Sequence, residues 1–276
     1  MYRILAVFIV IVHLFVWSSC NKFTKIQKSK DYDYKLTKAD EYFQKKNYKF
    51  ARMLYEELFP VLKGTERFED LFYKYAFCFY NEEDYYGAEN LFKQYLEVFP
   101  NSAKAEEVDY LKAYCCYKLS PKVELEQVNT VRAIGMMQTF INTHQGSERN
   151  KEATEIIDKL RKKLEQKEYR SADLYYKTGE FKSASIAFAG LLNNYPESET
   201  GDYYKWMSVQ ACYKYAQMSA ISKQEERYQK VIDGYEDFTD RYPESKYLSD
   251  AKNLATISEQ KIKFIQNEQI TQTPQQ

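Results

Sequence analysis

The strongest constraint on the fold is a pattern of small and aromatic residues within paired helical segments. In the stretch Leu71–Pro100, two apolar helical segments flank a polar turn at Asn81–Asp84. Ala76 lies in the first segment and Ala88 in the second. Small residues at these positions let two helices approach closely, and Pro100 ends the second helix because proline cannot continue it. The stretch therefore predicts an antiparallel helix pair.

The same pattern recurs along the chain, which predicts a repeat protein. The small residue of the first helix recurs at Ala39, Ala76, Ala113, Ala172 and Ala211, and the first two gaps are both 37 residues. This period is close to the ~34 residues of a tetratricopeptide (TPR) repeat. The chain also has only eight glycines and six prolines, which are few for the many turns of a many-stranded fold. We expect an all-α fold, an α-solenoid of about five TPR-like helix pairs with a C-terminal capping helix.

Two pairs are longer than the template, and the pair boundaries share a short motif. Extra residues fall at Ser120–Thr130 in the third pair and around Ser219–Arg227 in the fifth, which predicts enlarged turns. In the first boundary, Asn101 and Ser102 offer side-chain oxygens that can cap the next helix. The boundaries are Pro100-Asn101-Ser102, Pro196-Glu197-Ser198 and Pro243-Glu244-Ser245.

The N-terminus indicates export followed by lipid attachment. A basic residue, Arg3, precedes the apolar run Ile4–Trp17, which is shorter than the roughly 20 apolar residues of a spanning helix. Cys20 follows two serines, and this arrangement resembles a bacterial lipobox, in which the cysteine is acylated and becomes the first mature residue. We expect a signal peptide at 1–19, lipidation at Cys20 and a flexible lipidated tether at 20–34. An ordinary secretory signal with an incidental cysteine, or a short membrane anchor, is the alternative.

The rest of the chain divides at the long helical stretch that follows the third pair. We expect N-terminal TPR units 1–3 at 35–147, C-terminal units 4–5 with the capping helix at 148–267, and a disordered tail at 268–276. The remaining cysteines lie in apolar helical stretches without CxxC spacing, which favours buried free thiols. They are Cys78, Cys115, Cys116 and Cys212.

Composition and motifs argue against catalysis and against nucleic-acid binding. Lysine plus arginine equals aspartate plus glutamate at 40 each, so no global field favours nucleic acid. The sequence has no glycine-rich phosphate loop, nucleophile elbow or HExxH motif. Only His13 and His144 are present, which excludes a multi-histidine metal site. We expect a protein that is not an enzyme, with no cofactor, no metal and no nucleic-acid partner.

A candidate binding surface follows from the repeat positions. In TPR arrays the first helix of each pair lines a concave groove, at offsets −3, +1 and +4 from the template alanine. Tyrosine offers a large apolar face and a hydroxyl at low entropic cost, which suits an extended peptide. The alternative is that these rings only pack neighbouring helices. The predicted peptide-binding groove is formed by Tyr73, Phe77, Tyr80, Tyr110, Tyr114 and Tyr117.

The lipobox, the short tether, the five TPR-like pairs and the Pro-x-Ser boundaries together resemble the BamD family of outer-membrane assembly lipoproteins. The resemblance implies a component of the β-barrel assembly complex, lipid-anchored in the outer membrane through Cys20 and facing the periplasm. It also implies binding of a BamA-type POTRA protein through the C-terminal units, and of C-terminal peptides of unfolded outer-membrane proteins through the N-terminal ones. A TPR lipoprotein for glycan or nutrient binding, or for pilus or secretion assembly, is the alternative.

Overall fold

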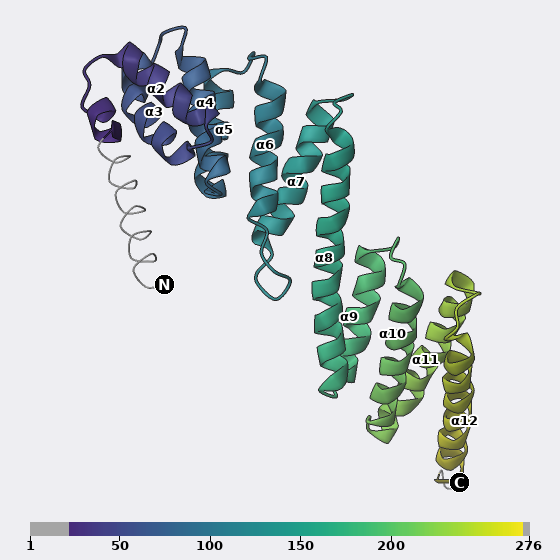
Figure 1. Ribbon diagram of the computed structural model, residues 1–276. Helices are drawn as coiled ribbons and strands as arrows, with labels where there is room; N and C mark the ends of the chain where they lie inside the picture. The colour runs from purple at the N-terminus through teal and green to yellow at the C-terminus, as the bar shows by residue number, and fades with distance from the viewer. Residues whose placement is uncertain (1–21, 273–276) are drawn as a thin grey trace, which may run out of the picture. The chain divides into compact units, whose positions relative to one another are not determined.

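The protein is built from helices joined by short connections (Figure 1). The computed structural model describes residues 22–272, and in this range the backbone forms helices and turns but no strand. Residues 22–27 are helical. The helices that follow are α2 (Tyr32–Gln44), α3 (Tyr48–Leu62), α4 (Phe68–Asn81), α5 (Tyr85–Val98), α6 (Ala105–Lys118), α7 (Val128–Thr143), α8 (Asn150–Lys177), α9 (Phe181–Asn194), α10 (Gly201–Gln217), α11 (Ile221–Arg241) and α12 (Leu248–Gln272).

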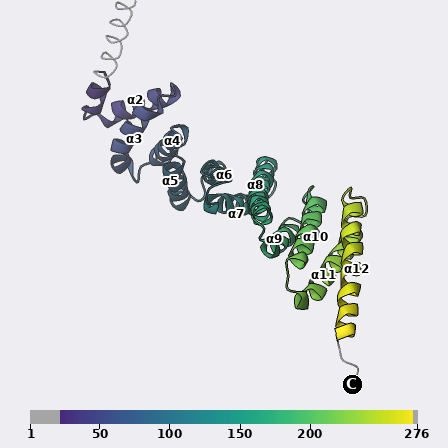
Figure 2. The ribbon, with the colours of Figure 1, turned by 90° about the horizontal axis from the view of Figure 1, so that it is seen from below.

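Each helix packs mainly against its neighbours in the chain. Contacts join α2 to α3 and continue stepwise to α7, and they join α9 to α10, α11 and α12 in the same stepwise way. Figure 2 shows the same succession from below. Because a helix pair cannot bury its apolar face alone, each pair completes its core with the next. The predicted all-α, TPR-like α-solenoid is confirmed.

The chain forms two compact units, Met1–Leu160 and Arg161–Gln276, and the division falls inside α8. The first unit contains the pairs α2–α3, α4–α5 and α6–α7 together with the start of α8. The second contains the rest of α8, then α9, the pair α10–α11 and α12. The domain limits 35–147 and 148–267 expected from the sequence stay a prediction.

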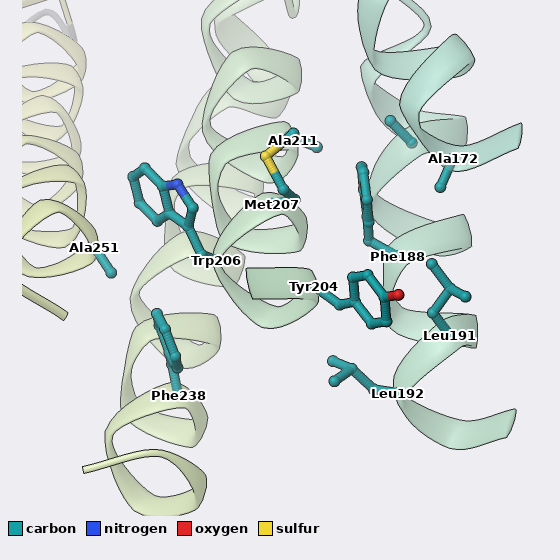
Figure 3. Close-up of a cluster of buried hydrophobic side chains, with 11 residues drawn as sticks. Ala172, Phe188, Leu191, Leu192, Tyr204, Trp206, Met207, Ala211, Phe238 and Ala251 are labelled. Carbon is teal, nitrogen blue, oxygen red and sulfur yellow. The ribbon is translucent and has the colours of Figure 1, made fainter. Parts of the chain in front are cut away.

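The core of each unit is formed where small residues allow close helix approach. All five template alanines are buried. In the second unit, Tyr204 and Met207 of α10 lie against Phe188 of α9, as Figure 3 shows. Burying a ring or aliphatic side chain of this size contributes roughly 1.5–3 kcal/mol, so these contacts stabilise the stacking of consecutive helices.

Three of the four described cysteines are core residues, and all four are free thiols. Cys78, Cys115 and Cys116 are buried, and Cys212 is half-buried. Burial raises the pKa of Cys78 and Cys116 to about 12. These thiols are therefore protonated at neutral pH and act as small apolar side chains, as their apolar sequence context predicts.

The segment before α2 differs from the flexible tether expected over 20–34. Residues 22–27 are helical, and Phe23 and Ile26 are buried in the core of the first pair. The Phe23 ring stacks on Phe50, with 4.4 Å between ring centroids. The expectation overlooked that an apolar residue at every third position gives even a lysine-rich segment a face that packs. Asp31 then caps α2 by accepting the Tyr34 N–H at 2.9 Å.

The two long pairs accommodate their extra residues in different ways. In the third pair α6 ends at Lys118 and α7 begins at Val128, so the enlarged turn is confirmed. In the fifth pair only residues 218–220 separate α10 from α11, so the predicted enlarged turn is wrong. Its extra residues extend α11 instead, because the region contains neither glycine nor proline, whereas Pro121 interrupts the third pair.

The C-terminal prediction also needs correction. The capping helix α12 continues to Gln272, beyond the predicted end at 267, so residues 268–272 are not part of a disordered tail. Residues 273–276 lie outside the described range. No glycine or proline occurs between Leu248 and Gln272, so nothing in the local sequence ends the helix earlier.

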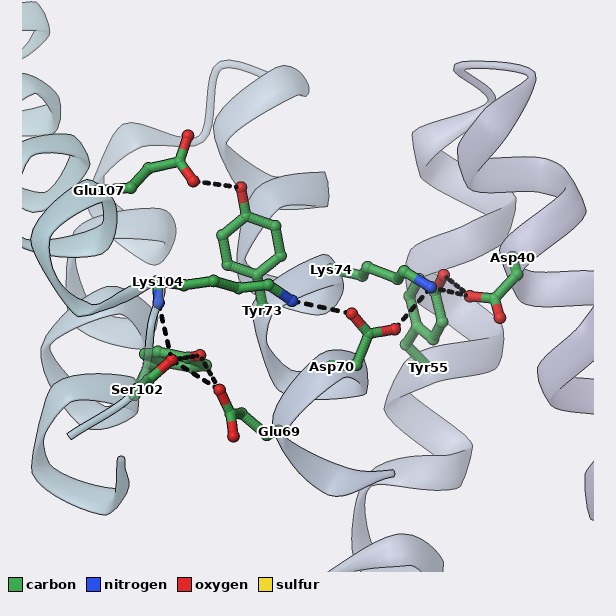
Figure 4. Close-up of polar contacts among 10 residues, drawn as sticks. Asp40, Tyr55, Glu69, Asp70, Tyr73, Lys74, Ser102, Lys104 and Glu107 are labelled. Atoms are coloured by element: carbon green, nitrogen blue, oxygen red, sulfur yellow. Dashed lines mark hydrogen bonds and ion pairs between the residues drawn. The ribbon is translucent and has the colours of Figure 1, made fainter. Parts of the chain in front are cut away.

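At the four boundaries after the second pair, a serine bonds back to the preceding pair, including at one boundary that lacks the Pro-x-Ser motif. Ser102 Oγ donates to Glu69 Oε1 in the first turn of α4 at 2.6 Å, and accepts from the Lys104 N–H at 3.0 Å (Figure 4). The cap of α6 is Lys104, without a side-chain bond, so Ser102 is not the helix cap expected from the sequence. Equivalent bonds join Ser147 to Glu106, Ser198 to Glu165 and Ser245 to Asp202.

Candidate functional site: an aromatic stripe on the first unit

The six groove residues predicted from the sequence come from the first helices of two neighbouring pairs. Tyr73, Phe77 and Tyr80 belong to α4, and the other three, Tyr110, Tyr114 and Tyr117, belong to α6. Residues spaced by three or four lie on one face of a helix, so each helix presents one row of rings. These six residues are called the aromatic stripe below.

Within α4 and within α6, neighbouring rings of the stripe contact each other. The Tyr73 and Phe77 rings are stacked with 5.6 Å between centroids, and Phe77 lies 5.6 Å from Tyr80. In α6 the Tyr114 ring lies 5.9 Å from Tyr110 and 5.4 Å from Tyr117. Offset and tilted geometries at these distances are favourable for aromatic pairs.

A single contact joins the two rows. The Tyr80 and Tyr114 rings lie 6.3 Å apart and tilted by 54°. At the other side of α4, Phe77 lies 6.1 Å from Phe43 of α2. The rings therefore form a continuous series from α2 through α4 to α6.

The members of the stripe differ in exposure. Five are half-buried, but Tyr110 is only 3% exposed and packs against Phe140 of α7. Tyr110 is therefore a core residue that supports the stripe from below. The half-buried rings keep an accessible edge or face, which a residue serving only the core does not need.

Cationic side chains border the stripe. Lys104 Nζ lies 4.5 Å from the centre of the Tyr73 ring, and the Arg149 guanidinium lies 4.8 Å from that of Tyr110. Lys159 Nζ lies 5.5 Å from the Tyr117 ring centre and donates to its hydroxyl at 2.9 Å. A cation near an aromatic face is attracted by the ring quadrupole.

The three cations differ in their acidic partners. Lys104 pairs with Asp70 at 2.9 Å, and Arg149 pairs with Glu107 at 3.4 Å. Figure 4 shows Lys104 beside Tyr73 and Asp70. Lys159 forms no ion pair within residues 22–272. Lys159 is thus the bordering cation that can accept an additional anionic group.

The hydroxyls of Tyr73 and Tyr80 stay neutral at physiological pH. Burial raises the pKa of Tyr80 to about 12, and the nearby Tyr114 and Cys115 add to this effect. Burial also raises the pKa of Tyr73, whose hydroxyl donates to Glu107 Oε2 at 3.2 Å. The stripe therefore combines apolar ring faces with hydroxyl groups and a cationic border.

The role of the bordering cations was missed by sequence reasoning. Lys104 directly precedes α6, Arg149 directly precedes α8 and Lys159 lies within α8, so the cations come from outside the rows of rings. No spacing within one helix pair can identify such partners. Phe43 lies four residues after Ala39, at one of the offsets that face the groove. This spacing is the one sequence signal for its place at the end of the series of rings.

Among residues 22–272 no helix is long and apolar enough to cross a membrane. Over the same residues, no group of three or more histidine, cysteine, aspartate and glutamate side chains is arranged to hold a metal ion. Cys20, the predicted lipidation site, and the predicted signal peptide lie outside the described residues.

Comparison with solved structures gives weak matches. The TPR2AB domain–pHSP90 complex of yeast Sti1 aligns at 11% identity over 83% of this chain and 98% of that one, with a TM-score of 0.39. The Rap conjugation gene regulator of plasmid pLS20 with the Phr* peptide aligns at 13% identity over 89% and 77%, with a TM-score of 0.34. The apo form of RapI aligns at 13% identity over 84% of this chain and 99% of that one, with a TM-score of 0.31.

Comparison with curated proteins finds no match. Comparison with protein families, in contrast, finds the family YfiO, described as outer membrane lipoprotein, over residues 28–200 and 171–268. The two matched segments together cover most of the chain, including both compact units. The chain therefore belongs to the YfiO family of outer membrane lipoproteins, which is the BamD family that its sequence resembles.

Proposed function

We propose that the protein is a non-enzymatic scaffold of the β-barrel assembly machinery, anchored by an acylated Cys20 to the outer membrane and facing the periplasm. In this role it binds C-terminal peptides of unfolded outer-membrane proteins through the first unit and a BamA-type POTRA protein through the second. Family membership supports the general role. The observation that carries the peptide-binding role is the continuous series of half-buried rings from α2 to α6.

The chemistry of the stripe suits a peptide that ends in an aromatic residue. Half-buried tyrosine rings offer apolar faces for stacking against aromatic side chains, and their hydroxyls can bond peptide amides. Lys159 lies at the Tyr117 end of the stripe without a carboxylate partner in the described chain. Its ammonium group can pair with the terminal carboxylate, which is a charge-assisted interaction.

Affinity purification tests the assembly role directly. The chain, tagged at its C-terminus and expressed in its own cell, is solubilised from outer membranes in mild detergent, and the co-purifying proteins are identified by mass spectrometry. We expect a BamA-type POTRA protein in stoichiometric yield. Recovery of glycan-uptake, pilus or secretion components, without any β-barrel assembly protein, would contradict the proposal.

A peptide-binding measurement tests the role of the stripe separately. Fluorescence anisotropy compares a labelled peptide ending in phenylalanine with the same peptide amidated at its C-terminus. We expect weaker binding of the amidated form, because it lacks the charge that pairs with Lys159. The Lys159→Gln variant should bind both forms equally, whereas a preference that survives this substitution would assign the carboxylate to another residue.

A further inference from the structure

The segment that precedes α2 is fixed to the first helix pair by both apolar and polar contacts. Phe23 and Ile26 are 5% and 7% exposed. Gln27 Nε2 donates to Glu57 Oε1 at 2.8 Å, and Lys35 Nζ donates both to the Gln27 carbonyl at 2.9 Å and to Glu57 Oε2 at 2.7 Å. Lys35 is itself buried, so its end of the bridge is shielded from solvent, whereas the Glu57 side chain is 34% exposed. The orientation of residues 22–27 on the first pair is therefore defined.

This segment begins at one particular end of the first pair. The Phe23 ring contacts Tyr42, close to the end of α2, and Phe50, close to the start of α3, with ring centroids 6.0 and 4.4 Å apart. Farther along, Gln27 reaches Glu57 in the second half of α3. The described chain thus begins, at Lys22, at the end of the pair where α2 turns into α3.

Lysines from two separate parts of the chain gather at this end. Lys22 and Lys25 come from the N-terminal segment, and three others come from the α2–α3 turn and the start of α3. All are exposed, and none forms an ion pair within residues 22–272. These anchor-end lysines are Lys22, Lys25, Lys45, Lys46 and Lys49.

Two of the acidic groups near this end already form ion pairs. Glu41, in the last turn of α2, pairs with Lys38 at 2.7 Å. Glu82, at the corresponding turn of the second pair, pairs with Arg52 at 2.6 Å. The anchor-end lysines therefore keep a local excess of positive charge in a chain whose formal net charge is zero.

We propose that the anchor-end lysines form a membrane-facing surface that binds the anionic headgroups of phospholipids next to the lipid anchor. The inference rests on the proposed acylation of Cys20. Cys20 lies two residues before Lys22, so acyl chains on Cys20 would bring these lysines to the headgroup layer. Lysine charges near an anionic bilayer surface are attracted within about one Debye length, roughly 8 Å at physiological ionic strength.

The consequence is orientation rather than additional anchoring. Several acyl chains alone hold a protein firmly on a bilayer. A fixed segment with a basic surface around the anchor adds a preferred direction, because it turns the α2–α3 end of the first pair towards the membrane. The first unit would then stand in a defined orientation on the bilayer instead of rotating freely about its anchor.

The test uses the full-length protein, processed in its own cell and reconstituted into vesicles. An amine-reactive reagent modifies accessible lysines, and mass spectrometry measures the extent at each position. Vesicles of phosphatidylcholine are compared with vesicles of phosphatidylcholine and phosphatidylglycerol. We expect several-fold lower labelling of the anchor-end lysines on the anionic vesicles, and recovery of labelling at high salt.

Lys63 serves as an internal control on the same helix pair. It is exposed and lies just beyond the opposite end of α3, about 21 Å from Lys49 at 1.5 Å per residue. Its labelling should not depend on headgroup charge. Equal labelling of the anchor-end lysines on the two kinds of vesicle would overturn the proposal, as would an equal decrease at Lys63.

Two variants separate charge from shape. In the Lys22→Gln/Lys25→Gln/Lys49→Gln variant, the protection of Lys45 and Lys46 on anionic vesicles should fall, and in the corresponding arginine variant it should persist. Lys46 is left unchanged because its backbone is left-handed, with φ at 57°. Protection that persists in the glutamine variant overturns the role of charge.

The intact mass of the mature protein distinguishes this inference from the anchor itself. If Cys20 is acylated but the labelling does not depend on headgroup charge, the proposed lysine surface is overturned and the lipid anchor is retained. A protein without acyl groups, mixed with the same vesicles, can still show protection that depends on headgroup charge. That result overturns the anchor at Cys20 and supports the lysine surface.

Discussion

The rings of Tyr80 in α4 and Tyr114 in α6 lie 6.3 Å apart, and this contact joins the rows of the aromatic stripe from two helix pairs. We expect the Tyr73→Ala/Tyr80→Ala/Tyr114→Ala variant to lose affinity for a peptide ending in phenylalanine by about tenfold or more, since buried aromatic anchors often contribute over 1 kcal/mol each. Fluorescence anisotropy gives the affinity. Tyr86→Ala is the matched control, because Tyr86 is 74% exposed and outside the stripe.

Circular dichroism of the triple variant checks that the helices remain. If the variant keeps its helix content and binds the peptide as tightly as the unchanged protein, the stripe is a packing feature only. An equal loss in Tyr86→Ala would likewise show that the binding is not specific to the stripe.

The serine links between pairs should contribute measurably to stability. Ser102→Ala removes the donor to Glu69, and we expect a loss of about 1–2 kcal/mol in the free energy of unfolding, as for a hydrogen bond to a charged group. Urea unfolding followed by circular dichroism measures this loss. Thr139→Ala is the control, because the Thr139 hydroxyl bonds only the Gly135 carbonyl of its own helix.

A double-mutant cycle assigns the effect to the pair. The losses caused by Ser102→Ala and Glu69→Gln should be less than additive in the double variant, since both remove one interaction. Strict additivity would mean that the 2.6 Å contact contributes no coupling energy.

Two glycines in the first unit should respond to alanine in opposite ways. A Cβ at Gly87 would lie 2.6 Å from Phe79 Cδ1, whereas at Gly135 nothing lies within 4 Å. We expect Gly135→Ala to stabilise the protein by about 0.5–1 kcal/mol, because alanine reduces the conformational entropy of the unfolded chain. Gly87→Ala should destabilise it by roughly 1–3 kcal/mol through overpacking. Thermal unfolding measures whether each variant is more or less stable than the unchanged protein. A gain of stability in Gly87→Ala would show that Phe79 moves aside freely.

Asp70 predicts an acid-dependent loss of stability. Burial raises its pKa, but hydrogen bonds from Lys74 and Lys104 outweigh burial, so the pKa of Asp70 is lowered overall. A lowered folded-state pKa means that the contribution is fully present above the unfolded value near pH 4 and is lost as the pH falls through the folded value. Figure 4 shows Asp70 with both lysines.

The Asp70→Asn variant measures this contribution. At neutral pH it should be less stable by roughly 0.5–1 kcal/mol, because the carboxylate is largely exposed and screened by solvent. Urea unfolding at a series of pH values should show the two proteins converging below about pH 4. A difference that stays constant down to pH 2 would assign the effect to something other than the ionised carboxylate.

Cys20→Ala should abolish membrane anchoring. Without the thiol no acyl chain can be attached, so we expect the intact mass of the mature protein to lack acyl groups and the protein to leave the membrane fraction. Cys212→Ala is the control, because Cys212 is a half-buried thiol of α10. Retention of the Cys20→Ala protein in the membrane fraction would favour an uncleaved membrane anchor instead.

Local sequence was sufficient for most of the fold because helix pairs depend on local spacing. Ala76 and Ala88 identified two helices that pack closely, and both alanines are fully buried. The enlarged turn of the third pair was visible because Pro121 interrupts the helix. The fifth pair had no such interruption, and helix formation extended α11 instead. Propensity decides such a region, whereas a count of extra residues does not.

The rows of aromatic rings in the candidate site were predictable from the sequence, whereas the cations that border them were not. Offsets from Ala76 and Ala113 placed Tyr73, Tyr80 and Tyr114 on the first helices of their pairs. The same offsets could not reveal that Tyr110 is covered by Phe140. They also could not place a cation beside Tyr117.

The sequence by itself determined the helix pairs, their small-residue contacts and their terminating prolines, because these depend on residues a few positions apart. Only the tertiary structure decided which rings meet between pairs, which cations border them and how residues 22–27 dock on the first pair. Those contacts join residues far apart in the chain, such as Lys159 and Tyr117 or Gln27 and Glu57. Their geometry depends on how consecutive helices stack, which no local pattern encodes.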